Sequence, residues 1–137
     1  MASRRSVPRL RIVVVEDSPL LRELLCDMLA QLDGVEVVAA AAGEAAALRA
    51  LQEQPSDLVI VDLQLESGSG LGVLRALRRE PARYGQPIAV VFSNYGHVQL
   101  RERCRALGVA HFFDKALQMD ELIDFVEAAR KGVVGDH

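Results

Sequence analysis

Five polar side chains stand just after short apolar runs, and together they could handle a phosphoryl group. They are Glu16 and Asp17 after Ile12–Val15, Asp62 after Leu58–Val61, Ser93 after Ile88–Phe92, and Lys115 shortly after Val109–Phe113. Carboxylates that lie close together repel one another, which raises the pKa of at least one unless a cation intervenes. Mg²⁺ is the natural cation, because it takes hard oxygen ligands and keeps several waters. A carboxylate can also act as a nucleophile and form an aspartyl phosphate.

The other two side chains complement this acidic group. Lys115 supplies a compact positive charge that can pair with a phosphate oxygen, and Ser93 supplies a hydroxyl for another oxygen. Such groups spread the charge of a transferring phosphoryl group, which is most of what this catalysis requires. Taken singly, Asp17 and Asp62 could be helix caps or loop residues, and Ser93 could be an N-cap.

The apolar runs alternate with helical patterns along the whole chain. Strands are predicted at 11–15, 35–40, 58–61, 88–92 and 109–113, and helices from Ser18-Pro19, over 44–54, from about 71 to near Pro81, over 98–107 and over 119–131. This order predicts an α/β fold, a doubly wound (βα)5 parallel sheet with helices on both faces. Ligands bind at the carboxyl ends of such strands, so the five side chains should converge there.

Length and composition fit one domain. We expect a basic, flexible tail over 1–9, the domain over 10–131 and a short tail over 132–137. A net charge of −3 does not favour nucleic acid or anionic membranes as partners, and no apolar run approaches a membrane span. We find no signal peptide, so we expect a cytoplasmic protein in which Cys26 and Cys104 are reduced.

Four segments together resemble the response-regulator receiver domain of bacterial two-component signalling. They are Val-Val-Val-Glu-Asp-Ser, Val-Asp-Leu-Gln-Leu-Glu-Ser-Gly-Ser-Gly-Leu, Val-Val-Phe-Ser-Asn and Phe-Phe-Asp-Lys. The resemblance covers about residues 10–131, and the four segments occur in order at the strand ends. It implies a flavodoxin-like fold with strand order 2-1-3-4-5, and a stand-alone, single-domain regulator.

The resemblance also implies roles for individual residues. Asp62 would be the phosphoacceptor, Lys115 the phosphate-binding lysine and Ser93 the switch hydroxyl. The metal ligands would be Glu16, Asp17, Asp62 and the backbone carbonyl of Gln64. Phe112 matches the aromatic residue of the family's switch, and Gln64 and Tyr95 occupy positions that tune the lifetime of the phosphate.

By resemblance, the function is to accept a phosphoryl group on Asp62 from a histidine kinase or histidine phosphotransfer protein. The reaction would depend on Mg²⁺ and would switch a surface that binds a downstream protein target. Such a domain is no enzyme beyond its own phosphotransfer and autodephosphorylation.

Three positions depart from the common pattern of the family. Glu66 and Ala116 replace prolines, and Phe112 replaces a tyrosine, so its ring can pack but cannot hydrogen-bond.

Three other functions remain to be weighed. A pseudo-receiver would bind partners without phosphorylation, and the intact acid, hydroxyl and lysine set argues against it. A haloacid-dehalogenase-like phosphatase would need an aspartate as general acid where Gln64 stands. A nucleotide-binding protein would need a Gly-rich phosphate loop, which this chain lacks.

Phe112 could also be a packing residue. Since it alternates with Phe113 along a strand, one ring should face the core and the other outward.

Overall fold

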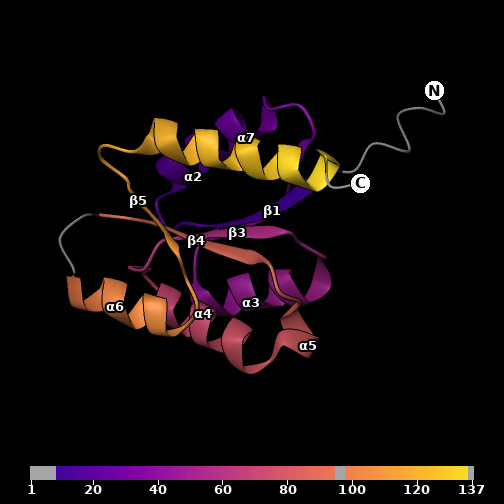
Figure 1. The fold of residues 1–137 in the computed structure, drawn as a ribbon. Coiled ribbons are helices and arrows are strands. Elements are labelled where there is room, and N and C mark those ends of the chain that lie inside the picture. The colour runs from indigo at the N-terminus through magenta and orange to yellow at the C-terminus, as the bar shows by residue number, and fades with distance from the viewer. Residues whose placement is uncertain (1–8, 95–97, 136–137) are drawn as a thin grey trace.

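The computed structural model describes residues 9–94 and 98–135, which form a five-stranded parallel sheet with helices on both faces (Figure 1). The strand order is β2-β1-β3-β4-β5, as predicted. The strands are β1 (Leu10–Val15), β2 (Val35–Ala41), β3 (Leu58–Val61), β4 (Ile88–Ser93) and β5 (His111–Asp114). The helices are α2 (Pro19–Ala30), α3 (Glu44–Glu53), α4 (Gly70–Arg79), α5 (Pro81–Tyr84), α6 (Val98–Ala106) and α7 (Met119–Gly135).

Two hydrophobic clusters hold the three layers together. Helices α2 and α7 cover one face of the sheet, and α3, α4, α5 and α6 cover the other (Figure 1). Side chains of β1 alternate between the clusters, since Ile12 and Val14 face α2 and α7 whereas Val13 and Val15 face α3. Burial on both faces explains why the central strands are continuous apolar runs.

The strand register brings the polar residues to one level. Val15 pairs with Val61, and Val61 pairs with Val91. The residues that follow these positions therefore leave the sheet at the same edge. At the far strand, Ser93 pairs with Asp114, which places Lys115 beside Ser93.

Strand β5 is shorter at its start than predicted. The strand was expected from Val109, but it begins at His111. The Val109 amide donates instead to Cys104 O at 3.0 Å and the Gly108 amide to Arg105 O at 2.9 Å, a Schellman closure of α6. Gly108 adopts φ +91°, which this closure requires.

Other boundaries also differ from the predictions. The short helix α5 was not predicted, because Pro81 was taken as the end of the preceding helix rather than as the first residue of a new turn. Helix α7 continues to Gly135, so residues 132–135 of the predicted tail are helical. Phe112 and Phe113 are both half-buried, since each packs against a different cluster, so the prediction that one faces outward was wrong.

Two further expectations concern the cysteines and the membrane. Cys26 is half-buried and Cys104 is buried, and both are free thiols. Among the residues that the structure describes, no helix has both the length and the apolar character that a membrane span needs.

Candidate phosphoryl-transfer site

The loop after β1 holds the first carboxylate in place through its backbone. The Glu16 amide donates to Ala41 O at 2.9 Å, which continues the pairing of β1 with β2. The Ser18 amide donates to Glu16 Oε2 at 3.0 Å, while Ser18 Oγ caps α2 by accepting from the Leu21 amide at 3.3 Å. The Glu16 side chain is thereby directed inward, and the residue is only 2% exposed.

Asp62 stands at the end of β3 with both carboxylate oxygens bound. Its amide donates to Val15 O at 3.0 Å, and the residue is 3% exposed. Asp62 Oδ1 accepts from Ser93 Oγ at 3.0 Å and from the Gln64 amide at 3.2 Å. Asp62 Oδ2 lies 2.5 Å from Lys115 Nζ. The carboxylate is therefore oriented by donors from three separate segments.

A tight turn after β5 presents Lys115 to the acids. The Lys115 amide donates to Ser93 O at 3.1 Å, and Asp114 Oδ1 accepts from the Ala116 amide at 2.9 Å in an Asx turn. Lys115 Nζ pairs with Asp62 and also lies 2.8 Å from Glu16 Oε1. Burial lowers the pKa of Lys115, but its ion pairs with these two carboxylates outweigh that effect and raise the pKa above its usual value.

Three carboxylates converge closely enough to hold a metal ion. One oxygen each from Glu16, Asp17 and Asp62 lie within 4.8 Å of one another. Burial raises the pKa of Glu16, and the Asp62 charge adds to this effect, whereas Lys115 and the Ser18 amide oppose it. Glu16 Oε1 is buried and its ion pair with Lys115 lacks the alignment of a hydrogen bond. Such crowded, under-coordinated oxygens suit a hard divalent cation.

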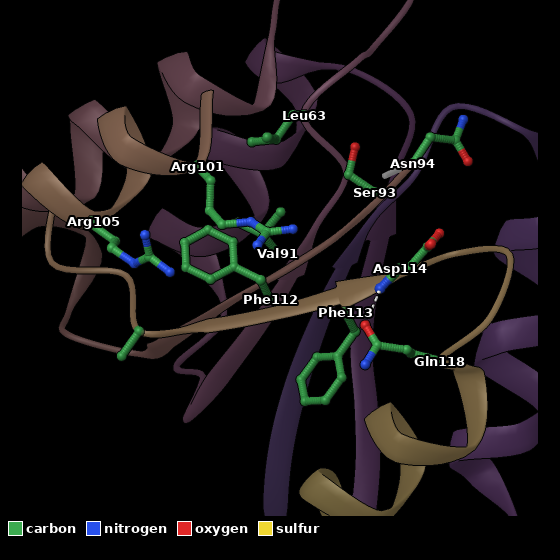
Figure 2. Close-up of a pocket in the computed structure, with 11 residues that line it drawn as sticks. Leu63, Val91, Ser93, Asn94, Arg101, Arg105, Phe112, Phe113, Asp114 and Gln118 are labelled. Carbon is green, nitrogen blue, oxygen red and sulfur yellow. Dashed lines mark hydrogen bonds between the residues drawn. The ribbon is translucent and has the colours of Figure 1, made fainter. Parts of the chain in front are cut away.

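A cavity of about 400 Å³ opens beside Ser93 and runs along β5. Figure 2 shows the Phe112 and Phe113 rings leaving β5 in opposite directions, with only Phe112 turned towards α6. The Arg101 and Arg105 guanidinium carbons lie 5.7 and 5.5 Å from the centre of the Phe112 ring. Both distances are in the range of cation–π attraction.

The structure thus gathers five of the predicted side chains at one sheet edge, namely Glu16, Asp17, Asp62, Ser93 and Lys115. The Gln64 side chain is exposed, and the contact that Gln64 makes with Asp62 comes from its backbone amide. Tyr95 lies outside the described residues. Sequence reasoning missed Arg22, which donates from Nη1 to Glu16 O at 2.8 Å. Its position one helical turn after Ser18, on the helix that follows the acids, was an available signal.

Comparison with known proteins places these observations in a family. The sequence model of one protein family, the response regulator receiver domain, matches residues 12–127. The probable chemotaxis protein CheY of Rhizobium etli is 28% identical over 120 residues, covering 88% of this chain and 92% of the relative. The phosphate regulon regulator PhoB of Klebsiella pneumoniae is 31% identical over 123 residues, covering 90% of this chain and 52% of the relative.

Other relatives are considerably longer than this chain. A protein-glutamate methylesterase/protein-glutamine glutaminase of Clostridium acetobutylicum is 29% identical over 116 residues, which cover 83% of this chain and only 33% of the relative. Among solved structures, the receiver domain of the putative response regulator NarL from Mycobacterium tuberculosis has a TM-score of 0.79 at 26% identity. That match covers 91% of this chain and 98% of the other. The chain belongs to the response regulator receiver domain family.

Proposed function

We propose that this chain is a single-domain response regulator that accepts a phosphoryl group on Asp62. The observation that carries the proposal is the set of contacts around that carboxylate. Lys115, Ser93 and the Gln64 amide all donate to Asp62, and Glu16 and Asp17 lie beside it. Among the relatives, the length of the Rhizobium etli CheY supports a single-domain form, because the match covers 92% of that protein.

The donor is a phosphohistidine of a histidine kinase or of a histidine phosphotransfer protein. An Asp62 oxygen forms the new bond to phosphorus while the bond from phosphorus to the histidine nitrogen breaks, and the imidazole leaves and takes a proton. Glu16, Asp17, Asp62 and the Gln64 carbonyl would hold Mg²⁺, which would neutralise charge on the phosphoryl oxygens. Lys115 then pairs with a phosphoryl oxygen in place of the free Asp62 carboxylate.

The same residues connect phosphorylation to a surface. Ser93 Oγ now donates to Asp62 Oδ1, and after transfer it donates to a phosphoryl oxygen instead. When the Ser93 hydroxyl moves, the Phe112 ring can repack into the cavity beside Ser93. Because Phe112 contacts Arg101 and Arg105 of α6, its repacking changes the surface of α6 and β5 offered to a downstream protein.

The proposal assigns no further catalysis to the chain. The chain spans about a third of the Clostridium methylesterase relative, so that protein's activity is not transferred to it. Exposed Gln64 borders the site at a position where it can influence attacking water, so it is proposed, with Tyr95, to tune the phosphate lifetime. We propose two activities for this chain, namely transfer of a phosphoryl group to Asp62 and hydrolysis of the resulting aspartyl phosphate.

Intact-protein mass after incubation with acetyl phosphate tests the proposal. With Mg²⁺, the wild type should gain one phosphoryl group. The gain should disappear in Asp62→Asn and when Mg²⁺ is removed by chelation. No gain in the wild type, together with no binding of beryllofluoride, would contradict the proposal and favour the pseudo-receiver.

A further inference from the structure

The N-terminus of α4 is capped in an unusual way. Ser69 is the N-cap residue, and its Oγ accepts from the Gly72 amide at 3.1 Å. In a capping box, a Glu or Gln three residues after the cap returns the bond by accepting from the cap residue's own amide. Gly72 holds that position here and has no side chain to do so.

Glu44, the first residue of α3, supplies the missing acceptor from a neighbouring helix. Its Oε1 accepts from the Ser69 amide at 2.9 Å. A Cβ added to Gly72 would overlap the Glu44 carboxylate, so the glycine leaves the space that this carboxylate fills. The carboxylate also lies at the positive end of the α4 dipole, where negative charge is favoured.

The loop closed by this contact is the one that follows the phosphoacceptor. Ser69 forms an isolated antiparallel bridge with Gln64, and the Gly70 amide donates to Leu63 O at 3.1 Å. The Gln64 amide in turn donates to Asp62 Oδ1. An unbroken series of contacts therefore runs from the Glu44 carboxylate to the Asp62 carboxylate.

We propose that Glu44 is a positioning residue for the phosphorylation site. Its carboxylate completes the capping box of α4 from outside the helix, and thereby fixes the loop that holds Gln64 against Asp62. The inference rests on the proposed function, in which the Gln64 carbonyl is a Mg²⁺ ligand. Glu44 itself touches neither metal nor phosphate, and it acts through Ser69 and Gln64.

The test is the Mg²⁺ dissociation constant, measured by NMR from the amide shifts of Asp62 and Gln64. Glu44→Ala removes the acceptor, and Gly72→Ala displaces it while improving the helix propensity of α4. Each should weaken Mg²⁺ binding about threefold to tenfold, at or below the usual effect of an outer-shell partner. Each should also speed hydrogen exchange of the Ser69 amide. Exposed Glu66, in the same loop, gives the charge-matched control Glu66→Ala.

Rescue separates positioning from general damage. In Glu44→Ala/Gly72→Glu the helix supplies its own capping-box glutamate, so Mg²⁺ affinity and Ser69 protection should return to near wild type. The inference is overturned if Glu44→Ala binds Mg²⁺ as the wild type does, if it weakens binding no more than Glu66→Ala, or if Gly72→Glu fails to restore it. Absence of Mg²⁺ binding by the wild type would instead contradict the proposed function itself, and the inference with it.

Discussion

Replacing Lys115 with methionine should destabilise the fold in a strongly pH-dependent way. The substitution keeps most of the side-chain stem and removes the ammonium group. Lys115 Nζ lies 2.5 Å from Asp62 Oδ2 and 2.8 Å from Glu16 Oε1, and its side chain is 14% exposed. Without it, two buried carboxylates face each other with no lysine between them. Removing one partner of a buried ion pair typically costs about 3–5 kcal/mol.

Protonation of Glu16 limits how much free energy of unfolding Lys115→Met can lose. Unit charges 2.8 Å apart attract by about 6 kcal/mol at an effective dielectric constant of about 20, before the cost of desolvation. The variant can avoid an unpaired charge by protonating Glu16, whose pKa burial already raises above 4.5. At pH 7 that protonation costs about 3.4 kcal/mol relative to the unfolded chain, and at pH 5 it costs less than about 1 kcal/mol.

The sign of the pH effect follows from the two groups. Lys115 has a raised pKa in the folded state, so its stabilisation is complete below 10.5 and is lost only as the pH rises above that value. Glu16 also has a raised pKa, so the folded state binds the extra proton and stability falls as the pH rises through and above 4.5. Removing Lys115 removes the group that opposes the Glu16 shift, so the loss grows between pH 5 and pH 7.

Urea unfolding followed by circular dichroism, at pH 5 and pH 7 without Mg²⁺, measures this loss. We expect Lys115→Met to lose about 2–3 kcal/mol at pH 7 and less than about 1 kcal/mol at pH 5 relative to the wild type. Lys131→Met, at an exposed lysine of α7, is the matched control and should lose less than about 0.5 kcal/mol at either pH. An equal loss at both pH values, or a loss at pH 7 no larger than the control's, would refute the reasoning.

Three other predictions follow from the same geometry. Gly70→Ala should cost more than about 2 kcal/mol, because a Cβ there would overlap the Asp62 and Leu63 backbone; Gly132→Ala, in open space, should cost nothing, and equal urea midpoints would contradict this. Ser93→Ala should cost about 1 kcal/mol by removing the bond to Asp62 Oδ1, and an unchanged midpoint in the same assay would count against that bond. Burial raises the pKa of Cys26 and Cys104, so both thiols should react slowly with a disulfide reagent at pH 8, and buried Cys104 should react after Cys26; the reverse order would be a contradiction.

The sheet was predictable because its signals are local and strong. Val13, Val14 and Val15 belong to one β-branched run, and a helical pattern separates it from the next run. The rule that parallel strands present ligand-binding residues at their carboxyl ends then predicted that Glu16, Asp62 and Lys115 meet. Their distances in the structure agree with that prediction.

The features that could not be predicted from the sequence depend on contacts between distant segments. The start of β5 depends on whether the Val109 amide closes α6 or pairs with β4, and both choices suit a valine. The partial burial of both Phe112 and Phe113 follows from helices on both faces of an edge strand. Glu44 resembles any helix-opening glutamate until Gly72, on another helix, is seen to leave space for it.

Mapping the modified residue tests the central claim most directly. After acetyl phosphate and Mg²⁺, borohydride reduces an aspartyl phosphate to homoserine, which tandem mass spectrometry locates in the digest. The account predicts homoserine at position 62, and none in a sample prepared without Mg²⁺. Homoserine at Asp17 or elsewhere, or phosphate on Ser93 with an unmodified Asp62, would contradict it.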